Sequence, residues 1–249
     1  MSSFEFSAMQ WVLILIAAVC IGLSKAGFGG VAMLSILIMA QIMPARESTG
    51  VILPMLILAD IFAVRVFHAH ARLALVLRML PPALAGIICG WWLMPRIPAE
   101  SFARFIGWLS IALIVLVLIQ KQAPNLLKVA AEKRRFAWPL GWMAGLTTML
   151  ANAAGPVMTV YLLACKLPKL AFVGTAAWFF FAVNLAKVPF SWGLGLINPG
   201  SLWINLMAAP GVIVGIFCGR WLLTKINQNL FEWLLIGFSL IGAIRLVLL

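Results

Sequence analysis

Pro81-Pro-Ala-Leu-Ala-Gly86-Ile-Ile-Cys-Gly90-Trp-Trp92-Leu decides the fold of this chain, because the same pattern occurs twice. Residues 210–222 read Pro-Gly-Val-Ile-Val-Gly-Ile-Phe-Cys-Gly-Arg-Trp-Leu, and they follow the first stretch at an offset of 129 residues. An apolar composition makes chance matches of Leu or Ile common, but it does not explain proline, glycine, cysteine and tryptophan matched in one register. We infer an internal duplication.

The duplication reaches the earlier part of each half as well. Gly22-Leu-Ser24 corresponds to Gly145-Leu-Thr147, and Asp60 corresponds to Asn184. Duplicated membrane chains are typical of transporters, in which two repeats meet at a central binding site. The expected organisation is one transmembrane domain over residues 1–249, with repeat 1 at 1–120, a polar linker at 121–135 and repeat 2 at 136–249.

The composition indicates a polytopic, all-α membrane protein. Hydrophobic residues make up 65% of the chain and charged residues only 10%, which is too few to cover the surface of a soluble domain. The net charge of +12 is spread singly over short loops, as in cytoplasmic loops of membrane proteins, so we expect membrane lipid and no nucleic acid as partner. No catalytic motif, metal-binding set or cofactor motif is visible, and we expect no enzyme activity.

Each half contains five apolar segments. The first two of each half are short, a glycine-rich break separates them, and they are predicted to be broken or re-entrant helices. The segments are 9–24, 31–43, 50–64, 75–94 and 102–119 in the first half, and 136–150, 155–165, 170–187, 202–223 and 230–248 in the second.

Loop charge predicts that the two repeats are inverted. Basic residues surround the loop at 65–78 and fill the linker at 121–135, whereas the loop at 198–201, which corresponds to the first of these, has none. Lys and Arg accumulate on the cytoplasmic side. Corresponding loops are therefore expected on opposite sides of the membrane, with both termini outside.

The two glycine-rich breaks are the candidate binding site. Each precedes a short apolar helix, and the free N–H groups and dipole of a helix start favour an anion. Glycine lets a substrate approach the backbone closely. The alternative is that these glycines only allow helices to pack. The candidate substrate-binding residues are Ser24, Lys25, Gly27, Gly29, Gly30, Thr147, Thr148, Asn152 and Gly155.

Three charged positions have two interpretations each. Lys25 either adds positive charge to the site or lies in a cytoplasmic loop. Asp60, the only aspartate, is either a proton-titrating or gating residue paired with Lys25 or Arg65, with Asn184 as its repeat mate, or a residue near a helix end. Lys187 is expected to be an interface anchor, with an anion contact as the alternative.

The chain resembles the sulfite exporter TauE/SafE family of membrane proteins. The resemblance rests on Gly22-Leu-Ser-Lys-Ala-Gly-Phe-Gly-Gly30, on Asn152-Ala-Ala-Gly-Pro156 and on the duplicated layout of about 250 residues. It implies a multi-pass permease of the bacterial inner membrane that carries sulfite, sulfoacetate or a related sulfonate.

The sequence thus predicts a secondary transporter for a small sulfur-containing anion, bound between the two breaks. A proton transferred through Asp60 is the candidate coupling ion. A passive anion channel and a non-catalytic membrane subunit of a larger complex stay open as alternatives, and the oligomeric state is left undetermined.

Overall fold

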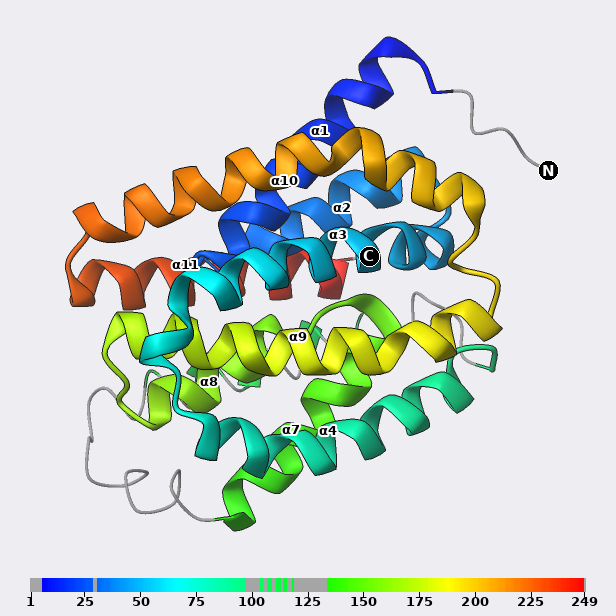
Figure 1. Ribbon diagram of the computed structural model, residues 1–249. Coiled ribbons are helices and arrows are strands. Elements are labelled where there is room, and N and C mark those ends of the chain that lie inside the picture. The colour runs from blue at the N-terminus through cyan, green and yellow to red at the C-terminus, as the bar shows by residue number, and fades with distance from the viewer. Residues whose placement is uncertain are drawn as a thin grey trace.

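The computed structural model describes residues 6–28, 31–96 and 134–248, with isolated residues between 104 and 118 (Figure 1). All regular structure in these residues is helical. The α-helices are α1 (Ala8–Lys25), α2 (Ala32–Ile42), α3 (Ala45–Phe67), α4 (Leu73–Leu93), α7 (Arg134–Ala151), α8 (Gly155–Ala164), α9 (Lys169–Gly193), α10 (Pro199–Lys225) and α11 (Gln228–Leu248), and a 3-10 turn, η2 (His68–His70), follows α3.

The predicted segments coincide with these helices, apart from 102–119, most of which falls outside the described residues. Capping side chains, backbone conformation and proline determine where several of these helices begin or end. Ser7 caps α1 and Asn198 caps α10, each in a reciprocal box with the residue three positions later. Asn152 has a φ of 53°, in the left-handed region that ends helices, and it directly follows α7. Pro156 occupies the first turn of α8, where a missing N–H costs nothing.

The first segment is longer than expected. α1 has 18 residues, and it is among the five helices in the described part of the chain that are long and apolar enough to cross a membrane. Two causes add to its length: the capping box at Ser7 begins the helix early, and Lys25 stays in the last turn because it has a buried partner. α2 and α8 are short, with 11 and 10 residues. The five long apolar helices are α1, residues 46–70, α4, α9 and α10.

The two halves pack on each other reciprocally. α1 lies against α10, and α7 lies against α4, so the first helix of each half contacts the fourth helix of the other (Figure 1). A Cβ on Gly22 would lie 2.2 Å from the carbonyl oxygen of Val212, and one on Gly145 would lie 1.9 Å from that of Ala83. Val212 and Ala83 are themselves at matching positions of the repeat. The glycines of the breaks therefore serve close packing between helix backbones.

The third helices of the two halves are antiparallel neighbours. Gly50, near the start of α3, packs against Leu196 just beyond the end of α9, while Gly174, near the start of α9, packs against Phe67 at the end of α3. The middles of α3 and α9 therefore meet at the centre of the protein. This contact positions the buried polar site.

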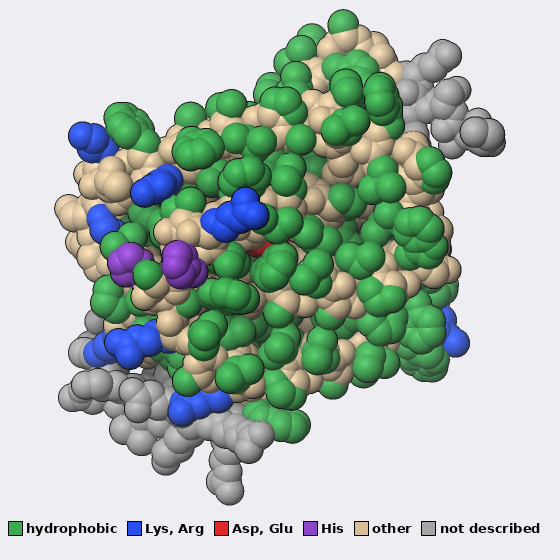
Figure 2. All heavy atoms as spheres, viewed as in Figure 1, with side chains coloured by type: hydrophobic (Ala, Val, Ile, Leu, Met, Phe, Trp, Pro, Cys, Tyr) green, Lys and Arg blue, Asp and Glu red, His purple; other side chains and the backbone are tan. Residues whose placement is uncertain are grey.

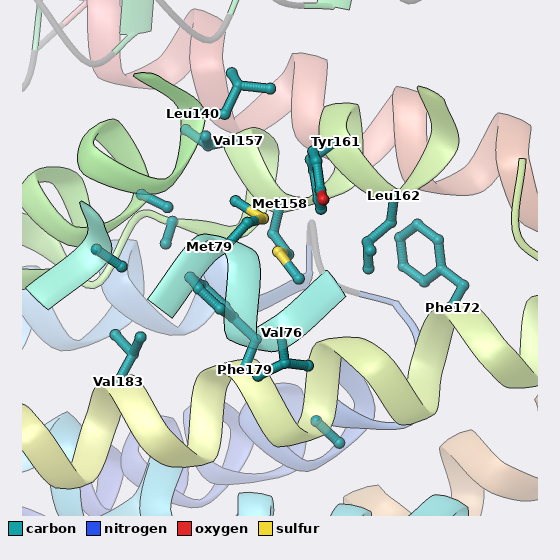
Figure 3. Close-up of a cluster of buried hydrophobic side chains, with 14 of the residues drawn as sticks. Val76, Met79, Leu140, Val157, Met158, Tyr161, Leu162, Phe172, Phe179 and Val183 are labelled. Atoms are coloured by element: carbon teal, nitrogen blue, oxygen red, sulfur yellow. The ribbon is translucent and has the colours of Figure 1, made fainter. Parts of the chain in front are cut away.

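Two apolar cores flank this central contact. One gathers α8 with side chains of α4, α7 and α9, and Figure 3 shows Met158 and Tyr161 of α8 enclosed among Met79, Leu140 and Phe179. The other core gathers α1, α2, α3 and α10. The repeated tryptophans Trp92 and Trp221 lie on the outside, 55% and 64% exposed, as expected for side chains that face lipid.

Basic side chains on the visible surface gather mostly at one end. Figure 2 shows His, Lys and Arg near that end and hydrophobic side chains over most of the remaining face. The turn η2 and the start of α7 lie at this end, and the connection between α9 and α10 lies at the other (Figure 1). The basic loop at residues 65–78 therefore lies at the end with most of the positive charge, and the loop at residues 198–201, which has no basic residue, lies at the other end.

Candidate functional site

A buried ion pair joins α1 to α3. The Nζ atom of Lys25 lies 2.8 Å from Oδ1 of Asp60, and the two side chains are 7% and 0% exposed. The Nδ2 atom of Asn184, on α9, donates a hydrogen bond of 2.7 Å to Oδ2 of the same carboxylate. Both carboxylate oxygens are therefore occupied, one by each neighbouring helix. Lys25 is not a loop residue and Asp60 is not at a helix end, so those two interpretations are wrong.

A second buried lysine completes the network. Lys187 is 2% exposed, and its Nζ donates to Thr148 Oγ1 at 3.2 Å, to Asn184 Oδ1 at 3.5 Å and to Oδ1 of Asn152. The expectation that Lys187 is an interface anchor is wrong. An anchor would keep its ammonium in water, whereas three side-chain oxygens surround this one. The Nδ2 atom of Asn152 in turn donates to the carbonyl oxygen of Thr49 on α3.

The network follows the internal repeat. At the offset of 123 residues that aligns Gly22 with Gly145, Lys25 aligns with Thr148, and at an offset of 124 residues Asp60 aligns with Asn184. Repeat 1 thus supplies a lysine at its break and an acid on its third helix, and repeat 2 supplies a hydroxyl at its break and an amide on its third helix. The central Asp60–Asn184 hydrogen bond joins the two halves.

A small cavity adjoins Lys25. Its volume is about 30 Å³, enough for one or two water molecules, and too small for a sulfite ion with its four heavy atoms. The Nζ atom of Lys25 lies 4.3 Å from the ring centroid of Phe180, within cation–π range. The site is therefore contracted in this structure. The lining comprises Ser24, Lys25, Gly27, Gly155, Met158, Thr159, Phe172, Val173, Ala176, Ala177 and Phe180.

Buried aromatic side chains pack beside this cavity, and one of them, Phe172, lines it. Phe231 packs edge-on against Phe172 at 5.5 Å and against Phe28 at 6.4 Å between ring centroids, and all three rings are buried. A separate depression of about 710 Å³ is lined in part by His70, Arg72, Lys169 and Gln228.

Most predicted site residues meet at this centre. Ser24, Lys25, Gly27 and Gly155 line the cavity, while Thr148, Asn152 and Asn184 bind Lys187. Thr147 is buried, but its hydroxyl donates to the carbonyl oxygen of Ala144 in its own helix. Gly29 and Gly30 lie outside the described residues. Among those that are described, no cluster of three His, Cys, Asp or Glu side chains could hold a metal ion.

Sequence reasoning misplaced one contributor and missed another. Lys187 was recognisable as a lysine within an apolar span, but two of its partners, Thr148 and Asn152, lie 39 and 35 residues away in sequence. Thr159 had no such signal, because a threonine in a short apolar helix is ordinary. It is 5% exposed and lines the cavity, and we find no hydrogen bond to its hydroxyl among the described residues.

Comparisons with known proteins identify the family. A search of the curated proteins and a search of the solved structures each returned no match. A sequence model of the family described as sulfite exporter TauE/SafE matches residues 14–246, nearly the whole chain. The protein therefore belongs to the TauE/SafE family of multi-pass membrane transporters.

Proposed function

We propose that this protein is a secondary transporter that carries a small sulfur-containing anion, such as sulfite or an organosulfonate, across the bacterial inner membrane. The anion binds at the centre of the protein, between the two helix breaks. The observation that carries this proposal is the pair of buried lysines, Lys25 and Lys187, set against the single buried carboxylate of Asp60. A buried excess of positive charge is costly, and an anion would neutralise it.

The hydrogen-bonding groups around Lys25 suit such an anion. The cavity has the first turn of α8 at one wall, because Gly155 begins that helix, and the first N–H groups of a helix have no partner within it. The hydroxyl of Thr159 adds a donor. A sulfonate or sulfite presents three oxygens, which matches a lysine, a hydroxyl and a helix start.

Alternating access between two inverted repeats is the mechanism we propose. The antiparallel contact of α3 with α9 supports inversion, because equivalent helices of the two halves run in opposite directions. Lys25, in the last turn of α1, reaches the middle of α3, which supports a first segment pair that ends within the bilayer. In this proposal residues 1–249 form one transmembrane domain, with halves 1–120 and 136–249 and a linker at 121–135. In this mechanism the small cavity at Lys25 widens toward one side of the membrane and then toward the other.

Counterflow in proteoliposomes tests the proposal. Vesicles loaded with sulfite, sulfoacetate, taurine, thiosulfate or sulfate are diluted into the same labelled anion, and saturable exchange of one of these anions is expected. Lys25→Ala should abolish the exchange, whereas Lys225→Ala, which removes an exposed lysine at the end of α10, should not. If exchange persists in Lys25→Ala, Lys25 does not take part in binding the anion. A conductance without counterflow would instead establish a channel.

A further inference from the structure

The charge of the buried site can be counted. Lys25 contacts Asp60 directly, and Lys187 lies beyond Asn184, which hydrogen-bonds both to Asp60 and to Lys187. Two ammonium groups and one carboxylate give this site a formal charge of +1. The count depends on Lys187 being protonated.

The hydrogen bonds around Lys187 suit an ammonium group. A protonated lysine has three N–H donors and no acceptor, and three oxygens surround this Nζ. The amide orientations are fixed from their other ends, because Nδ2 of Asn184 donates to Asp60 and Nδ2 of Asn152 donates to the carbonyl of Thr49. Both amide oxygens therefore turn toward Lys187 as acceptors.

No other described charge is placed to alter the count. Of the elements packed on α3, α1 contributes Lys25 and α9 contributes Lys187, while α2 carries no charged residue. The two histidines of η2, His68 and His70, and Arg65 of α3 itself are exposed. The charged residues of α10, Arg220 and Lys225, are exposed near its end, and those of α7 are in its first turn. Asp60 is thus the group that sets the charge of the site.

We propose that Asp60 selects the charge of the transported anion. With Asp60 ionised, the site takes a singly charged anion, which brings the buried charge to zero. A doubly charged anion enters only together with a proton on Asp60, because the site then carries +2. This inference rests on the proposed transport function and assigns its substrate by charge. Asp60 takes the proton from water on the loading side and returns it on the release side.

The physical reason is the cost of buried net charge. In a medium of low polarity, an uncompensated charge is penalised far more than a matched pair. A dianion next to ionised Asp60 would leave the site at −1, and a monoanion next to a neutral residue at this position would leave it at +1. The residue at position 60 therefore decides which anion balances the site.

The test uses two sulfonates of similar size and different charge. Isethionate carries one negative charge and sulfoacetate carries two, and each is measured as an inhibitor of sulfite counterflow in wild type and in Asp60→Asn. In the variant, the potency of sulfoacetate relative to isethionate should rise at least about tenfold. Glu47→Gln, which removes an exposed acid from the same helix, should leave the ratio at the wild-type value.

Acidity supplies a second readout. As the pH is lowered, sulfoacetate should become more potent relative to isethionate in wild type, because a larger fraction of Asp60 is protonated, and the ratio should be flat in Asp60→Asn. If Asp60→Asn does not yield folded protein, Asn184→Asp carries the opposite prediction. A second carboxylate lowers the charge of the site to zero and should weaken sulfoacetate more than isethionate.

The outcomes separate the two proposals. If wild type shows sulfite counterflow but the ratio does not change in either variant, or neither sulfonate inhibits, the charge inference is overturned and transport stands. If sulfite and the other anions of the panel show no counterflow, both proposals fall.

Discussion

Loss of the Lys25 ammonium should destabilise the protein through Asp60. We consider Lys25→Met, which keeps the unbranched apolar part of the side chain and removes its charged end. At the observed 2.8 Å, the attraction between the two charges is about 6 kcal/mol for an effective dielectric constant of about 20. Protonation of the stranded carboxylate relieves part of this loss, so the expected cost is about 3–5 kcal/mol. Asp60→Asn should recover most of it, since the double variant buries no unpaired carboxylate.

The assay is thermal unfolding of detergent-purified protein, followed by intrinsic tryptophan fluorescence. For a chain of this size, 3–5 kcal/mol corresponds to roughly 6–20 °C in the midpoint. Wild type, Lys25→Met, Asp60→Asn and the double variant form a cycle that isolates the pair. The reasoning would be refuted if the double variant were as unstable as the sum of the two single changes, because the two side chains would then act independently.

Three further changes have defined outcomes. Gly145→Ala places a Cβ 1.9 Å from the carbonyl oxygen of Ala83, so it should cost about 1–3 kcal/mol and lower the unfolding midpoint, whereas Gly193→Ala, with no atom within 4 Å, should stay within about 0.5 kcal/mol. Lys187→Met leaves three oxygens without their donor and removes a positive charge, so half-saturation in counterflow should rise more than about tenfold; an unchanged value would exclude Lys187 from the site. Thr159→Val keeps the shape of the side chain and removes a hydroxyl, and half-saturation should rise roughly twofold to tenfold with no change in the unfolding midpoint.

Local signals in the sequence were sufficient for the helices. Apolar runs ended at Gly, Pro and Asn, and α2, α8 and α10 begin and end within a few residues of the predicted segments. The pairing of Lys25 with Asp60 was one of two alternatives. It could be proposed because a lysine and the only aspartate both lie in apolar surroundings, where unpaired charges are rare.

Contacts between the two halves could not be predicted from such local signals in the sequence. Lys187 has an alanine, Ala63, at the corresponding place in repeat 1, so the repeat gave no reason to place it at the centre. Its environment arises only when α7 and α9 meet. The helices that pack against Gly22 and Gly145 could not be predicted either. A glycine in the sequence indicates a close backbone contact, but it does not indicate which helix makes that contact.

The reciprocal packing of α1 on α10 has a consequence for how the protein is made. α1 is synthesised first, but the groove at Gly22 fits the backbone around Val212, which leaves the ribosome about 190 residues later. Until α10 is inserted, the face of α1 at Gly22 and the side chain of Lys25 are incompletely covered by protein. We therefore expect that neither half folds stably alone, because the first helix of each half packs against the fourth helix of the other. Co-expression of residues 1–133 and 134–249 as separate chains should therefore restore the assembly, and either fragment alone should be degraded.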